Sequence, residues 1–117
     1  MHDCAAAARI GGLQASRGGL MLANGQIKVV AQEVGRAAAE RIRNAGDQND
    51  RVQLWEVVRY ASRAIEAVVE IETQDLSASD RCRRARYLVS ELECALEAAR
   101  KAKAVLDWTA QRQRDAP

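Results

Sequence analysis

Apolar residues recur every three or four positions along three long stretches of the chain, and this spacing predicts three α-helices. In the first stretch, from about Gln26 to Asn44, Ile27, Val30 and Val34 share one face. The second stretch runs from about Asp50 to Glu72. Its apolar positions are Leu54, Val57, Val58, Ala61, Ala64, Ile65, Val68 and Ile71. This stripe is wide enough to contact two neighbours, so we expect the second helix at the centre of the core.

The third stretch begins after Ser77 and continues to about Gln111. It carries a heptad seam, an apolar residue at alternating steps of three and four, which is typical of helices that pack lengthwise. The seam comprises Ala85, Leu88, Leu92, Ala95, Ala99, Ala102, Leu106 and Thr109, and Val89 and Leu96 widen it. Because this helix is longer than the other two, its C-terminal end is expected to lack cover, which suggests a homodimer.

Helix boundaries are marked by capping residues. Gly46 follows the first helix and can adopt the left-handed conformation that ends helices. Asp50 with Gln53, and Ser77 with Asp80, resemble the capping boxes that begin helices. The turns predicted between the helices, Asp47–Asp50 and Thr73–Ser79, are short, so consecutive helices are antiparallel.

The two ends of the chain differ from this helical body, which we place at residues 26–112. Residues 1–25 hold five of the seven glycines, and Gly-Gly pairs weaken a helix. This arm is expected either to form a short kinked fourth helix docked on the body or to become ordered on a partner. Residues 113–117 are expected to be a disordered tail.

Composition supports an all-α fold, a small antiparallel helical bundle. The single proline is the last residue and phenylalanine is absent, so the core is expected to consist of Ala, Val, Leu and Ile. The only histidine is His2, the three cysteines form no Cys-x-x-Cys, and no pattern of metal ligands is present. We therefore expect neither a cofactor nor a metal, and no catalytic residues.

Charged residues are arranged in blocks along the second and third helices. When these helices fold back on each other, opposite charges come level, as one antiparallel register requires. The predicted pairs are Glu72–Arg81, Glu70–Arg83, Glu66–Arg86, Arg63–Glu91 and Arg59–Glu93. Arg83, Arg86, Glu93 and Glu97 are expected to point outward, either as a solvated face or as a surface that a charged protein partner recognises.

Two tryptophans are predicted at one end of the bundle. Trp55 begins the second helix and Trp108 lies near the end of the third, and Arg41 and Arg43 end the first helix nearby. Trp and Arg are enriched in binding hot spots. This group is therefore expected either to bind a partner or to seal the end of the bundle.

Cys82 is the one residue that suggests chemistry. It lies between Arg81 and Arg83 in the first turns of a helix, where positive charge favours the thiolate. The hypothesis is an oxidation-sensitive thiol, and the alternative is a small residue at the edge of the core.

The sequence as a whole predicts a non-enzymatic, cytoplasmic interaction module without a membrane span. It would act as a small regulator, adaptor or inhibitor that docks on a larger protein. The alternative is a nucleic-acid-associated protein that uses the Arg81–Arg86 cluster. The near balance of 18 basic and 16 acidic residues makes nucleic-acid binding the weaker expectation.

Overall fold

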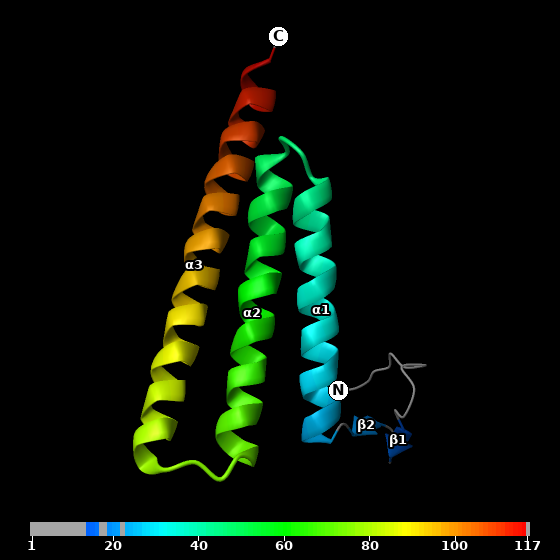
Figure 1. Ribbon diagram of the computed structural model, residues 1–117. Helices are drawn as coiled ribbons and strands as arrows, with labels where there is room; N and C mark the ends of the chain where they lie inside the picture. The colour runs from blue at the N-terminus through cyan, green and yellow to red at the C-terminus, as the bar shows by residue number, and fades with distance from the viewer. Residues whose placement is uncertain (1–13, 17–18, 22, 117) are drawn as a thin grey trace.

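The computed structural model describes residues 14–16, 19–21 and 23–116, and three helices dominate this part of the chain. They are α1 (Asn24–Asn44), α2 (Asn49–Thr73) and α3 (Ala78–Asp115). Consecutive helices run antiparallel (Figure 1). The expected all-α antiparallel bundle is confirmed. None of the described helices has an apolar stretch long enough to cross a membrane.

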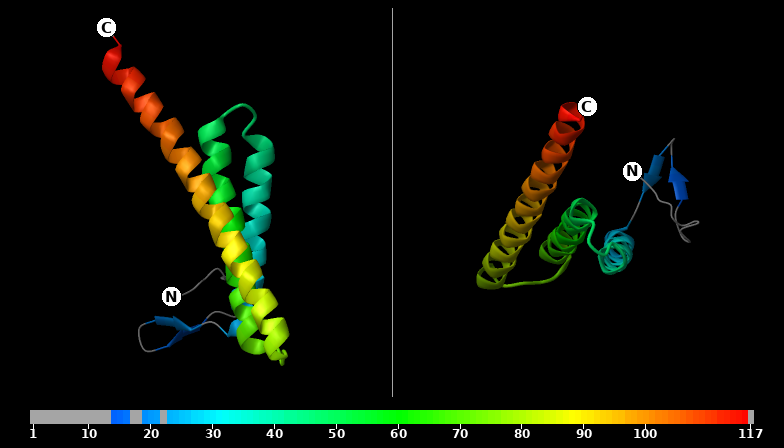
Figure 2. Two further views of the ribbon diagram at one scale, coloured as in Figure 1. Left: turned by 90° about the vertical axis from the view of Figure 1, so that its left-hand side faces the viewer. Right: turned by 90° about the horizontal axis from the view of Figure 1, so that it is seen from above.

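The three helices lie side by side in a single layer and do not surround a common axis. Among the described elements, α2 contacts both α1 and α3, whereas α1 and α3 do not contact each other. Figure 2 shows this order from above, with α2 between its neighbours. The central place predicted for the second helix is confirmed, but the layer remains open on both faces.

Two of the three predicted boundary signals are confirmed. Ser77 caps α3, because its hydroxyl oxygen accepts a hydrogen bond from the backbone N–H of Asp80 at 3.1 Å. Gly46 adopts a left-handed φ of 61° after α1. The Asp50–Gln53 capping box is wrong. Helix α2 begins one residue earlier at Asn49, and no side chain caps it.

Helix α3 extends to Asp115, past its expected end at Gln111. The side-chain amide of Gln111 donates to both carboxylate oxygens of Asp115 at 3.2 Å. Such bonds between residues four apart stabilise a helix end. Residues 113–115, expected to be part of a tail, are therefore helical, and α3 projects beyond α1 and α2 (Figure 1).

The described part of the N-terminal arm is a short hairpin. Strands β1 (Gln14–Ser16) and β2 (Gly19–Met21) pair antiparallel, with Ala15 opposite Leu20. Asn24 and Gly25, expected to be part of the arm, already belong to α1. Residues 1–13, 17–18 and 22, where a fourth helix was an alternative, lie outside the described residues.

The core consists almost entirely of alanine. The buried apolar residues of the described chain are Ala31, Ala38, Ala45, Ala64, Ala67, Val69, Ala98 and Ala102. Leucine and isoleucine, expected in the core, are not buried among the described residues. Alanine lets helix backbones approach closely, and a larger side chain between them would hold them apart.

The predicted α2–α3 register is confirmed at one pair and differs by one residue at another. Arg63 Nη1 lies 3.9 Å from Glu91 Oε1, as predicted. Glu70 pairs with Arg84 and not with Arg83, whose side chain turns back to Asp80.

The heptad seam assigned to α3 is partly wrong. Ala102 is buried as predicted, but Glu91 and Ala98 are the other buried residues of α3, while Leu92 and Leu106 stay 50% and 45% exposed. The helix is rotated so that its small residues meet α2. The reason is steric, since the leucines would prevent the close approach that the alanines allow.

Candidate interaction surface

Large apolar side chains are exposed on all three helices. We call the following set the apolar face: Val34, Leu54, Ile65, Val68, Val89, Leu92, Leu96 and Leu106, each between 41% and 53% exposed. Single exposed apolar residues are normal on any protein, whereas sets of them on one face are the kind of surface at which interaction sites occur.

The α2 and α3 members of this set lie on one side of the layer. In α2, Leu54, Ile65 and Val68 follow one helical stripe, because the intervals between them are sums of three- and four-residue steps. A groove of about 420 Å³ between α2 and α3 is lined by Leu54, Ala99 and Leu106, so the stripes of the two helices border the same groove.

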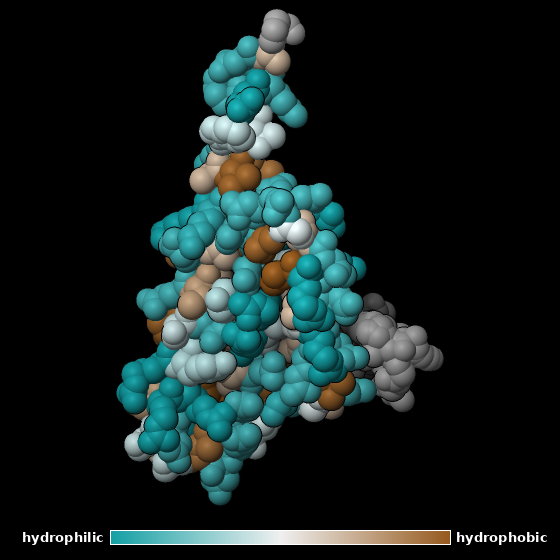
Figure 3. All heavy atoms as spheres, turned by 45° about the horizontal axis from the view of Figure 1, so that its top comes forward, coloured by the Kyte–Doolittle hydropathy of each residue, from teal (hydrophilic) through white to brown (hydrophobic). Residues whose placement is uncertain are grey.

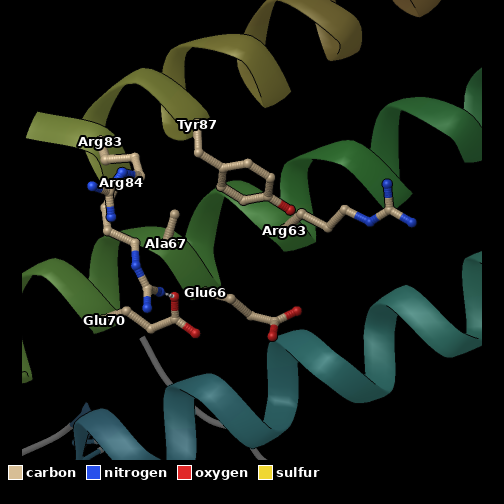
Figure 4. Close-up of a pocket in the computed structure, with 7 residues that line it drawn as sticks. All are labelled: Arg63, Glu66, Ala67, Glu70, Arg83, Arg84 and Tyr87. Carbon is tan, nitrogen blue, oxygen red and sulfur yellow. Dashed lines mark hydrogen bonds and ion pairs between the residues drawn. The ribbon is translucent and has the colours of Figure 1, made fainter. Parts of the chain in front are cut away.

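The other side of the layer is charged. Another groove, shown in Figure 4, is lined by Arg63, Glu66, Ala67, Glu70, Arg83, Arg84 and Tyr87. In Figure 3, hydrophilic residues cover most of the visible surface. The two faces of the layer therefore differ in chemistry.

Glu70 connects all three helices on this charged face. One carboxylate oxygen accepts from Arg84 of α3, and the other lies 3.2 Å from Nζ of Lys28 in α1. Figure 4 shows the Glu70 and Arg84 side chains directed toward each other. Since α1 and α3 do not contact each other, this half-buried carboxylate joins them through α2.

Tyr87 lies in the same groove, above Arg63 in Figure 4. Partial burial raises the pKa of its phenol above the usual 10.0, and the negative charge of nearby Glu91 acts in the same direction. Glu91 itself is 8% exposed, and its Oε1 has no hydrogen-bond partner.

The arginine cluster at the start of α3 is largely engaged by its own chain. Arg81 donates to the backbone oxygen of Ile71 at 2.8 Å, Arg83 to Asp80 at 2.8 Å, and Arg84 to Glu70. Arg86 is exposed. These internal partners compete with phosphate groups and disfavour nucleic-acid binding at this cluster.

Each of the two tryptophans in the predicted group stacks with an arginine. The guanidinium carbon of Arg41 lies 4.6 Å from the ring centre of Trp55, which joins the end of α1 to the start of α2. Trp108 is 60% exposed and stacks with Arg112 of its own helix at 4.8 Å. Arg43 lies 3.7 Å from Glu40 within α1.

The remaining predicted surface residues are exposed. They are Arg83, Arg86, Glu93 and Glu97. Cys82 is also exposed, so reagents can reach it, and its unusual reactivity stays a prediction. No cluster of three or more potential metal ligands occurs among the described residues.

The apolar face is the feature that sequence reasoning missed, although its signal was present. Val89 and Leu96 widened the apolar stripe of the third helix, and the second helix had an equally wide stripe. Apart from the C-terminal end of the third helix, both stripes were assigned to contacts between the helices, because sequence alone does not reveal how far each helix is rotated.

Comparison of the chain with protein-family models, with curated proteins and with solved structures finds no match.

Proposed function

We propose that this chain is a protein–protein interaction module that buries its apolar face against another polypeptide. A small regulator, adaptor or inhibitor would act in this way. The observation that carries the proposal is the apolar face, eight half-exposed large side chains spread over three helices.

The free energy of burying apolar surface supports the proposal. Removing apolar surface from water contributes roughly 25 cal/mol per Å², so covering many half-exposed side chains favours association. Within the layer this gain is not available, because α1 and α3 lie on opposite sides of α2 and neither folds over its stripe. The groove between α2 and α3 suits an amphipathic helix, and docking such a helix in a groove is a common way for helical proteins to bind.

A site-specific photo-cross-linker tests the proposal. It is placed at Leu92 on the apolar face or at Arg36, which is exposed and borders a groove on the charged face. We expect a discrete cross-linked product from position 92 and none from position 36, in cells that express the chain.

A second substitution in the Leu92 cross-linker chain shows whether the product depends on the apolar face. Val68→Asp should abolish the product. Val29→Asp is the matched control, because Val29 is 56% exposed but lies one turn before Gln32, which lines the same groove as Arg36. Equal yields from positions 92 and 36, or a product unaffected by Val68→Asp, would refute the proposal.

A further inference from the structure

A row of alternating charges runs along one edge of the apolar face on α3. Arg86, Glu93, Arg100 and Asp107 follow one another at intervals of seven residues, and all four are exposed. An interval of seven keeps residues on one side of a helix. We call these four residues the charge row.

The charge row lies beside the apolar stripe. Glu93 is adjacent to Leu92 and one turn beyond Val89, and Arg100 is one turn beyond Leu96. The side chains of Arg86, Glu93 and Arg100 form no ion pair or hydrogen bond with any described residue. Asp107 pairs with Lys103 of its own helix, at 2.6 Å.

We propose that a second copy of this chain covers the apolar face, with the two α3 helices antiparallel and centred near Glu97. This inference rests on the proposed function, because it names the polypeptide that occupies the same face. Charge complementarity selects this occupant and this orientation.

The antiparallel arrangement pairs every member of the charge row with an opposite charge. Arg86 comes level with Asp107 of the second copy, and Glu93 with Arg100 of the second copy. Two-fold symmetry repeats both pairs. A parallel arrangement in register would place each of these residues level with its own counterpart, so that like charges repel.

The apolar stripe supports the same centre. In the same register, Leu96 comes within one residue of level with Leu96 of the second copy, and Val89 within two residues of level with its Leu106. Leu92 comes within two residues of level with Lys103, whose ammonium is drawn toward Asp107 at the edge of the face. The aliphatic part of Lys103 can then pack against the leucine.

Helix length is an independent argument. The midpoint of α3, which spans Ala78–Asp115, also falls between Leu96 and Glu97, so this register overlaps the two helices along their whole length. The end of α3 that projects beyond α2 in one copy would lie alongside Val89 of the other. There it would also cover Ile65 and Val68 of α2, whose side chains are half exposed in a single chain.

Sedimentation equilibrium of the full chain tests the stoichiometry, and charge reversal tests the register. We expect wild-type protein to be dimeric at about 100 µM. Glu93→Arg and Arg100→Glu each create two like-charged pairs, and each should weaken the dimer about tenfold or more. Lys101→Glu is the control on the same helix, outside the charge row, and should leave the dimer unchanged.

Mixing the two reversal variants gives the most specific result. Each alone has like charges across the interface, but a heterodimer of Glu93→Arg with Arg100→Glu pairs opposite charges at both places. We expect the mixture to associate about as tightly as wild type. Failure of the mixture to recover association, with both variants as helical as wild type by circular dichroism, would overturn the register.

A distance measurement tests the orientation. In a Cys4→Ser, Cys94→Ser chain, a spin label on Cys82 should give a separation of about 45 Å between copies in the antiparallel dimer. Two parallel helices would give less than about 20 Å, which would overturn the proposal.

Three further outcomes separate this inference from the proposed function. A monomer at about 100 µM that still gives a face-dependent cross-link to a different protein overturns the second copy but leaves the proposed function standing. A monomer whose position-92 cross-link forms only with residues 1–22 of its own chain overturns both. A monomer without any product also overturns both.

Discussion

Gly35 of α1 lies directly against Ser62 of α2. A Cβ atom at position 35 would be 2.7 Å from Oγ of Ser62, closer than real Cβ contacts. Ser62 is 3% exposed, and its hydroxyl donates to the backbone oxygen of Arg59 at 2.7 Å. The absence of a side chain at residue 35 therefore lets the two helices approach at this level.

This contact predicts that Gly35→Ala destabilises the protein, although alanine favours helices. The clash with Ser62 should outweigh the helix propensity and lower the free energy of unfolding by about 1–2 kcal/mol. In a Ser62→Ala background the clash disappears. There, Gly35→Ala should raise the free energy of unfolding by up to about 1 kcal/mol. Urea unfolding followed by circular dichroism measures both values. A stabilising effect in both backgrounds would show that the close approach does not matter.

Glu70→Gln is expected to weaken the connection between the three helices. The amide keeps an acceptor but loses the charge that attracts Lys28 and Arg84, at a site where the carboxylate side chain is only 22% exposed. We expect a loss of about 1 kcal/mol in unfolding free energy, measured by urea denaturation. Glu33→Gln, at an exposed pair within α1, is the control and should cost less than about 0.5 kcal/mol. Equal losses would contradict the special role of Glu70.

Arg41→Gln should loosen the end of α1 from the start of α2. The guanidinium of Arg41 stacks over Trp55, and such contacts contribute about 0.5–1 kcal/mol at partly exposed sites. Trp55 fluorescence, recorded in a Trp108→Phe chain, should shift toward that of a solvated indole. Arg43→Gln, which removes only a pair with Glu40, should leave the spectrum unchanged.

The raised pKa of Tyr87 predicts a loss of stability at alkaline pH. Because burial and the charge of Glu91 raise the pKa of Tyr87 in the folded protein, the unfolded chain releases this proton at a lower pH. The contribution of Tyr87 to the free energy of unfolding is therefore fully present below about pH 10. It is lost as pH rises through the folded-state pKa. Absorbance titration in a Tyr60→Phe chain isolates this phenol. Glu91→Gln should lower the pKa of Tyr87, while Arg63, whose charge opposes the shift, stays in place. An unchanged titration in Glu91→Gln would refute this cause.

The periodicity of the sequence was sufficient for the helices, the antiparallel order and the central position of α2. Those features depend on local spacing and short turns, which one chain displays directly. The α2–α3 register was also readable at Arg63 and Glu91, because blocks of opposite charge constrain it over many residues. At Glu70 the prediction missed by one residue, since the choice between Arg83 and Arg84 depends on helix rotation.

The sequence by itself determined that three amphipathic helices form and in which order they fold back. Only the tertiary structure decided which part of each apolar stripe is buried. Ala102 of the predicted seam and Ala98 outside it occupy the contact with α2, whereas Leu92 and Leu106 of the seam remain half exposed. The physical reason is that the spacing of apolar residues places them on a helix face, but the size of the side chains sets the distance and rotation at which two faces pack. The apolar face exists because close packing of alanines left the larger side chains outside.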